Sequence, residues 1–126
     1  MSQQSRELFG KGRIAQSEIT ITAGNSTNSA VVIAAPTSQN GKVRTVIDEL
    51  WLSMDAAGYF TLVSTASSRQ LTPRIQFSES DSKHFHDLQL PANDVESVTL
   101  AITLPAAAAA TVTGSYWIRY HEERGA

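Results

Sequence analysis

The sequence contains no cysteine, and this absence excludes several kinds of chemistry. A chain without thiols has no disulfide, no thiolate nucleophile and no zinc or iron–sulfur site held by cysteine. Charged residues are also scarce, at 17% of the 126 residues, and the formal net charge is only −2. Because nucleic-acid-binding domains usually carry a clear excess of Lys and Arg, we expect no direct binding to DNA or RNA.

Long apolar runs are missing as well. No stretch approaches the roughly 20 apolar residues that a transmembrane helix requires. The opening segment, MSQQSRELFGKGR, also lacks the apolar core of a signal peptide. We therefore expect a soluble protein that does not use this export route and does not bind a membrane.

Catalytic sequence motifs are absent too. The sequence has no Gly-x-Ser-x-Gly elbow, no Walker A loop and no Gly-x-Gly-x-x-Gly loop. The acidic pairs Asp48–Glu49 and Glu79–Asp81 occur outside any recognisable pocket motif, so we interpret them as solvated strand ends. We predict that the protein is not an enzyme, has no catalytic residues and needs no cofactor.

The sequence does contain a succession of short β-branched and apolar segments, each followed by a turn cluster. This pattern is typical of all-β proteins. In residues 13–22, for example, Ile19 and Ile21 alternate with polar neighbours. Further along the chain, Asn40-Gly41 is a tight-turn signal directly before the long apolar segment at residues 43–54. The predicted strands cover residues 13–22, 30–35, 43–54, 58–65, 71–78, 84–90, 98–104 and 111–120.

Residues 44–54 carry two competing signals. The sequence VIDELWLSM has some helical periodicity, whereas Leu50, Leu52 and Met54 alternate as in a strand, with Trp51 on the other face. We favour a strand, because a turn signal precedes the segment and another strand-like segment comes directly after it.

These observations predict the fold class. About eight antiparallel strands with short connections favour an all-β, two-sheet sandwich, of jelly-roll type if the connections cross between the sheets. An up-and-down barrel and an immunoglobulin-like sandwich are the alternatives. We expect an N-terminal arm at residues 1–12 and one sandwich domain at residues 13–126.

The alanines Ala106 to Ala110 raise the question of a helix, because alanine is the best helix former. Five residues are too few to form a stable isolated helix, and Pro105 precedes them. We predict that this run is the crossing between the last two strands, where small side chains permit the close approach of another segment.

His84 and His86 are the only arrangement that resembles a metal-binding pair. Residues i and i+2 of a strand point to the same side, so both imidazoles could reach one ion. A third ligand would have to come from Asp81, Asp87 or His121. Alternation around a buried Phe85 explains the same pattern without a metal, and we predict no metal site.

Trp51, Tyr59 and Trp117 are candidate interaction residues. Both tryptophans occupy the face opposite the apolar stripe of their strand. Flat aromatic side chains suit either sugar stacking or a protein interface, and packing in the domain's own core is the third interpretation. In the polar N-terminal arm, Leu8 and Phe9 are candidate anchors on a neighbouring subunit.

Four segments carry a family resemblance: GKVRTVIDELWLSMDAAGYFTLVS, LTPRIQF, LQLPAND and VTLAITLPAAAAATVTGSYWIRY. With them, residues 12–121 resemble the small β-sandwich virion proteins of tailed bacteriophages, especially head decoration, or cement, proteins. The resemblance is one of texture and order, and it carries over no catalytic residue.

The resemblance implies a structural protein, assembled in the host cytoplasm, that binds the outer surface of the major capsid protein shell and stabilises it. It also implies a homo-oligomer, most often a trimer. Similar sandwiches occur in tail, baseplate and head-fibre proteins, and a carbohydrate-binding module is the rival outside this class.

Overall fold

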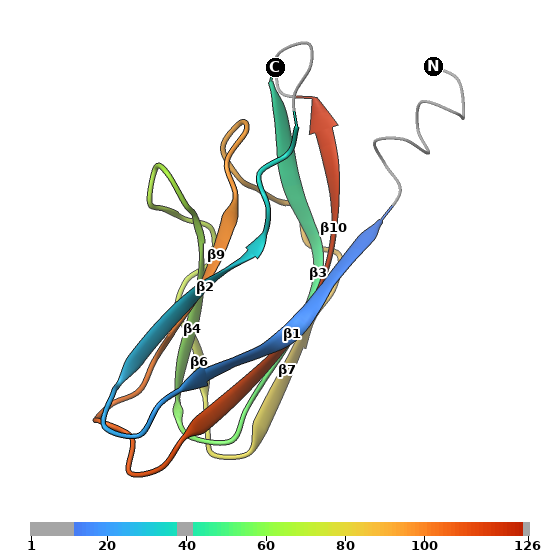
Figure 1. Ribbon diagram of the computed structural model, residues 1–126. Coiled ribbons are helices and arrows are strands. Elements are labelled where there is room, and N and C mark those ends of the chain that lie inside the picture. The colour runs from blue at the N-terminus through green and yellow to red at the C-terminus, as the bar shows by residue number, and fades with distance from the viewer. Residues whose placement is uncertain (1–11, 38–41, 125–126) are drawn as a thin grey trace.

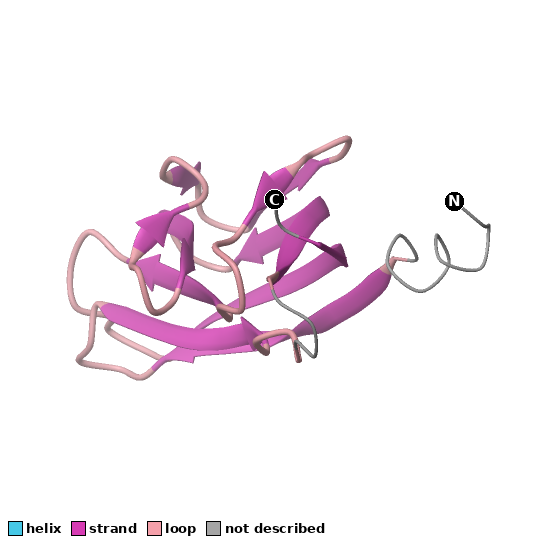
Figure 2. Cartoon of the chain, turned by 90° about the horizontal axis from the view of Figure 1, so that it is seen from above, coloured by secondary structure: helices cyan, strands magenta, loops and turns pink. Residues whose placement is uncertain are grey.

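The computed structural model describes residues 12–37 and 42–124. Within these ranges it contains ten strands and no helix (Figures 1 and 2), and consequently no helix that could cross a membrane. The strands are β1 (Arg13–Ile21), β2 (Thr27–Ile33), β3 (Val43–Met54), β4 (Gly58–Ser64), β5 (Arg69–Gln70), β6 (Ile75–Phe77), β7 (Asp81–Phe85), β8 (Leu90–Pro91), β9 (Val98–Thr103) and β10 (Val112–Arg124).

The strands form two antiparallel sheets of five strands each, which confirms the predicted all-β sandwich. The first sheet has the order β1-β10-β3-β7, and β8 also pairs with β3. The second has the order β2-β9-β4-β5, and β6 also pairs with β4. The connections from β1 to β2 and from β3 to β4 cross between the sheets, which a jelly roll requires; that subtype stays a prediction.

The core lies between the inner faces of the two sheets. Every second side chain of β4 and β9 is buried, as the alternation predicts, and β3 alternates in the same way from Leu50 to Met54. The fully buried large side chains include Phe60, Ile21, Ile47, Leu50, Leu52, Leu62, Leu100, Ile102 and Ile118. Burial of each such side chain stabilises the fold by about 1.5–3 kcal/mol, before the entropy of ordering the chain is subtracted.

A β-bulge interrupts the pairing of β3 with β10. Arg119 lies opposite Glu49, but the next residue, Tyr120, lies opposite Ile47, so Asp48 is the extra residue. As a result, the regular alternation of β3 breaks at this point: Ile47 and Leu50 are both buried, and the two carboxylates between them are not. The bulge therefore places two consecutive acidic side chains outside the core.

The alanine run forms the connection between β9 and β10 without a helix, as predicted. Its backbone bonds to the turn between β1 and β2: Gly24 N donates to Ala108 O (2.7 Å) and Ala108 N donates to Asn25 O (2.8 Å). Side chains no larger than methyl groups let these two loops approach closely enough to share backbone hydrogen bonds.

Several sequence predictions of strand limits were wrong. Residues 79–83, which lie between two predicted strands, include most of β7, and residues 84–90 are not one strand but the end of β7 and part of β8. The predicted strand 71–78 shrinks to β6, because Pro73 cannot donate to a ladder. Residues 121–124, which lie beyond the last predicted strand, extend β10 and pair with the start of β3.

Candidate functional site

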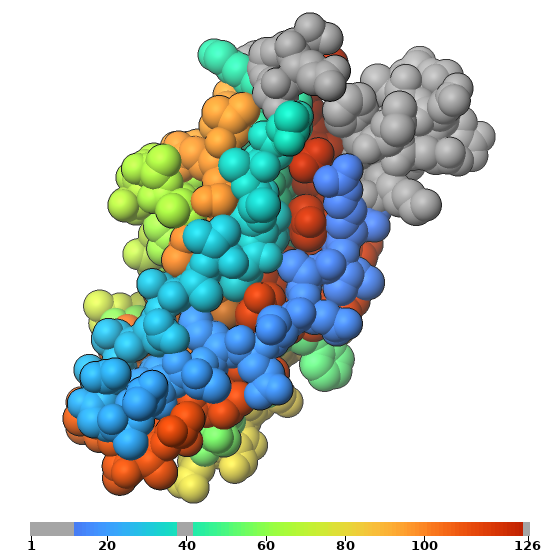
Figure 3. Space-filling model, viewed as in Figure 1, coloured from blue at the N-terminus to red at the C-terminus, as the bar shows by residue number. Residues whose placement is uncertain are grey.

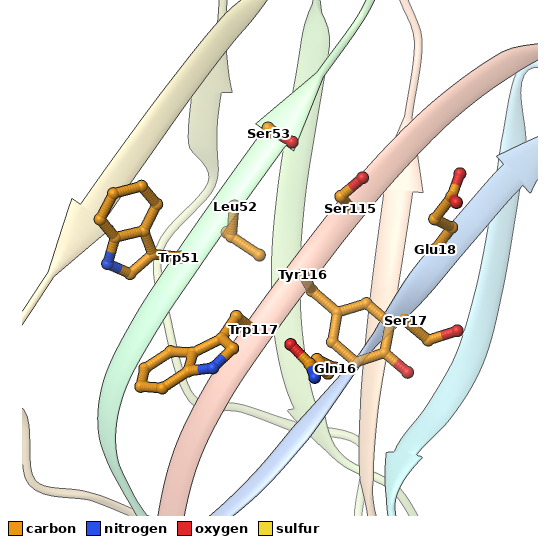
Figure 4. Close-up of a pocket in the computed structure, with 9 residues that line it drawn as sticks. All are labelled: Gln16, Ser17, Glu18, Trp51, Leu52, Ser53, Ser115, Tyr116 and Trp117. Carbon is orange, nitrogen blue, oxygen red and sulfur yellow. The ribbon is translucent and has the colours of Figure 1, made fainter.

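A row of four side chains crosses the outer face of the first sheet. Gln16 of β1 lies opposite Trp117 of β10, Trp117 lies opposite Trp51 of β3, and Trp51 lies opposite His84 of β7. Because directly paired residues of antiparallel strands project to the same side, these four side chains are neighbours on one surface. We call them the aromatic row; Figure 4 shows its two indoles and Gln16.

The aromatic row is accessible to a partner. Trp51 is 47% exposed, although its strand neighbours Leu50 and Leu52 are buried. The rings of Trp51 and His84 are 4.5 Å apart at an interplanar angle of 39°. A shallow depression of about 370 Å³ adjoins the row between β1, β10 and β3, lined in part by Gln16, Trp51 and Trp117 (Figure 4).

An ionic cluster flanks the aromatic row. Glu49 lies 2.6 Å from Nε2 of His84 through Oε2, and its Oε1 accepts a hydrogen bond from Nε of Arg119 (3.1 Å) and contacts Nη2 of the same side chain (3.0 Å). The hydrogen bond with His84 is the largest cause that lowers the pKa of Glu49, and together with Arg119 it outweighs desolvation. An ionised carboxylate therefore holds His84 beside Trp51.

The structure brings Trp51 and Trp117 together but separates them from Tyr59. Tyr59 lies on β4 of the second sheet, where the guanidinium carbon of Arg74 is 4.6 Å from the centre of its ring. The three aromatic residues therefore cannot line one groove. Leu8 and Phe9, like the Asn40-Gly41 turn signal, lie outside the described residues.

Of the two histidines, His84 lies on β7 and belongs to the aromatic row, and His86 lies just after the end of β7. The rings of His84 and His86 are 5.4 Å apart; His84 bonds Glu49, whereas Nδ1 of His86 lies 3.1 Å from Asp87. Residues 12–37 and 42–124 contain no group of three or more His, Asp or Glu side chains placed to hold a metal ion. The structure thus gives His84 an ionic and stacking environment.

Sequence reasoning did not anticipate the partners of the tryptophans. The alternation of β10 put Trp117 and Arg119 on one face, but only the strand register reveals that Glu49 and His84 complete the surface. Local periodicity does not determine the order of strands in a sheet, so no sequence motif could have predicted that residues from three strands lie together.

A second ionic cluster occupies the far end of β3 and β10. His121 lies 2.6 Å from Asp48 through Nδ1 and 3.2 Å from Glu123 through Nε2, and Glu123 also contacts Nη2 of Arg44 at 2.8 Å. Partial burial lowers the pKa of His121, but the hydrogen bonds to Asp48 and Glu123 outweigh it, so the pKa is raised.

This raised pKa predicts a pH dependence of stability. The stabilisation by His121 is fully present below its ordinary pKa of about 6.5 and is lost as the pH rises through the raised value. Between about pH 6 and pH 8.5 we expect the melting temperature to fall by about 1–4 °C more in the wild type than in His121→Gln. Calorimetry of both proteins at several pH values measures this difference. Parallel pH profiles would contradict the assignment.

Comparisons with known proteins show distant similarity to solved structures alone. No family model and no curated protein sequence match the chain. Among solved structures, it is similar to FLHE (14% identity, covering 90% of this chain and 98% of that one, TM-score 0.43). It is similar to the tobacco streak virus coat protein in its dimer (15%, 89% and 88%, TM-score 0.41). It is also similar to the Drosophila NLP-core (9%, 87% and 99%, TM-score 0.34).

Proposed function

We propose that this chain is a non-enzymatic structural protein of a tailed-phage virion. In this proposal it is a decoration, or cement, protein that binds the outer surface of the major capsid protein shell and stabilises it. The observation that carries the proposal is the aromatic row, with two adjacent tryptophans on the outer face of a rigid sheet.

The chemistry of the aromatic row suits a protein partner. Tryptophan and arginine are enriched where proteins bind one another, and a rim of polar groups usually surrounds the apolar centre. Here Trp51 and Trp117 form the centre, and the Glu49–Arg119 ion pair lies beside them. Two tryptophans and one ion pair give one copy only a modest binding free energy. Many copies bound to a symmetric shell together add up to a large stabilisation.

Loss of either indole should weaken attachment. We expect Trp51→Ala and Trp117→Ala each to reduce binding to expanded empty capsids of the encoding phage by about 30-fold, the effect of a central interface residue. Cosedimentation across a range of protein concentrations measures the affinity. Tyr59→Ala is the matched control, because it removes an aromatic residue from the other sheet and should leave binding unchanged.

Two other binding results would contradict the decoration role and support a different function. Binding to purified tails instead of capsids would place the protein among the tail, baseplate or head-fibre sandwiches. The adjacent indoles in a shallow depression also suit sugar stacking, so a glycan array is the second test. Glycan binding that Trp51→Ala abolishes, without capsid binding, would identify a carbohydrate-binding module.

A further inference from the structure

β1 is an open edge of the first sheet. Within the described residues it pairs only with β10, and the register runs from Arg13 to Ile21 without a bulge. Edge strands are normally protected by proline, bulges or very short length, because their unpaired backbone groups can bind another strand. β1 is nine residues long and has none of these features.

The hydrogen bonds around Thr20 reveal which backbone groups face this open edge. Its partner Thr113 donates its N–H to the Asp55 carboxylate (3.1 Å) and accepts from Asp55 N (3.2 Å), so these groups of Thr113 point away from β1. On the other side, Thr20 O accepts a hydrogen bond from Nδ2 of Asn28 in β2 (2.6 Å). The backbone N–H and C=O of Thr20 therefore point away from β10.

The same orientation recurs at every second residue of a regular antiparallel strand. The backbone groups of Ile14, Gln16 and Glu18 consequently face the open edge as well. These three residues are exposed, with Ile14 at 55%, and no side chain among the described residues bonds their backbone as Asn28 bonds Thr20. In Figures 1 and 3, β1 diverges from β2 toward its N-terminal end, so β2 does not cover this part of the edge.

We propose that a second copy of this chain binds here, with β1 pairing antiparallel to β1 about a two-fold axis at Gln16. In this register Gln16 faces the partner's Gln16, and Ile14 faces the partner's Glu18. The open groups form three hydrogen-bonded pairs of two bonds each, and Thr20, already covered by Asn28, is not needed.

The sequence of the open segment favours a second copy as the occupant. In an antiparallel pair centred on Gln16, the open N–H and C=O of Ile14, Gln16 and Glu18 meet the same groups of the second copy, so the two edges satisfy each other. If the pairing shifted by one residue, backbone N–H and C=O groups that face the open edge would lie opposite groups that face β10. The side chains of the second copy would then also point to the opposite face of the sheet. The pairing also sets no like charges opposite each other, because Glu18 faces the partner's uncharged Ile14 and Gln16 faces the partner's Gln16.

The pairing would extend the candidate site. The two first sheets become one continuous sheet, and Gln16 of each copy, which lies opposite Trp117 in its own sheet, joins the two aromatic rows across the axis. Four tryptophans then lie on one face. The contact builds a dimer, in place of the trimer that the family resemblance implies, and it stands whether or not the protein binds a capsid.

The mass in solution tests the pairing. Sedimentation velocity of the full chain at micromolar concentration should give twice the monomer mass of 13.6 kDa. Gln16→Pro should give the monomer mass and keep the circular dichroism spectrum of the folded sandwich, because within one copy it removes only an N–H that faces the open edge. Gln16→Ala keeps that N–H and should remain a dimer. A wild-type monomer or trimer, or a dimeric Gln16→Pro, would overturn the proposal.

Charges of opposite sign introduced at Ile14 test the register of the pairing. Ile14→Glu places like charges opposite each other twice in the dimer and should raise the dimer dissociation constant at least tenfold. Ile14→Lys faces the partner's Glu18 and should leave the constant unchanged or lower it. Equal effects of the two substitutions would reject the axis at Gln16, and circular dichroism of both variants checks that the fold is kept.

Discussion

Replacing Phe60 with alanine should lower the free energy of unfolding by about 3–5 kcal/mol, a large part of the stability of a domain of this size. Phe60 is fully buried on β4 and meets Phe77 edge to face, with ring centres 4.9 Å apart. It also fills the space above Gly114, where an added Cβ would lie 3.0 Å from the Phe60 ring. Removing the ring leaves a cavity bordered by both sheets.

Urea denaturation measures the Phe60 effect, and its neighbour supplies the control. Tyr59 is next in sequence but points outward against Arg74, so Tyr59→Ala should cost about 1 kcal/mol or less. Phe60→Leu should fall between the two, because most of the volume is kept. Equal losses in Phe60→Ala and Tyr59→Ala would show that Phe60 does not hold the sheets together. If the slope of the unfolding free energy against urea concentration is the same in all variants, they unfold from equally compact native states.

Most of the fold could be predicted from side-chain alternation. Where one face of a strand is buried, period-two patterning determines which residues enter the core, and Leu50, Leu52 and Met54 are buried as expected. The same logic placed Trp51 outside. The alanine run was also predictable, because a short run after Pro105 cannot nucleate a helix.

The local exceptions arise from contacts between distant segments. The helical signal in residues 44–54 has a structural cause: the bulge at Asp48 buries Ile47 and Leu50, which are three residues apart, as in a helix. Likewise, residues 121–124 look like a tail because they are polar, yet they continue β10 by pairing with β3 and by the ionic cluster around His121. A single sequence does not reveal such a partner strand.

The candidate site was predictable only in its parts. Alternation identified Trp51 and Trp117 as outward-facing residues, but their pairing depends on the register of β3 with β10. Tyr59 is separated from them because β4 belongs to the second sheet, and alternation alone does not reveal to which sheet a strand belongs. Sequence therefore indicated the chemistry of the surface, and the sheet order determined which residues act together.

Among substitutions that add a single methyl group, Gly58→Ala should be the most destabilising. We expect it to lower the free energy of unfolding by about 3 kcal/mol. Gly58 begins β4 and is buried, and its added Cβ would lie 2.6 Å from the backbone oxygen of Thr103. Leu104 and Met54 side chains, at 3.1 and 3.3 Å, could turn aside. A backbone carbonyl in the neighbouring strand cannot, so β4 and β9 would have to separate where the core is closed.

Gly12→Ala distinguishes this lack of space from a general effect of replacing glycine. The added Cβ at Gly12 would also be close to its neighbours, at 3.2 Å, but those atoms belong to the flexible side chain of Arg119. We expect a change within about 0.5 kcal/mol at Gly12, because Arg119 can move and alanine lowers the entropy of the unfolded chain. Urea denaturation of both variants measures the contrast. Similar losses at the two sites would mean that the approach of Thr103 to Gly58 does not limit the packing of β4 on β9.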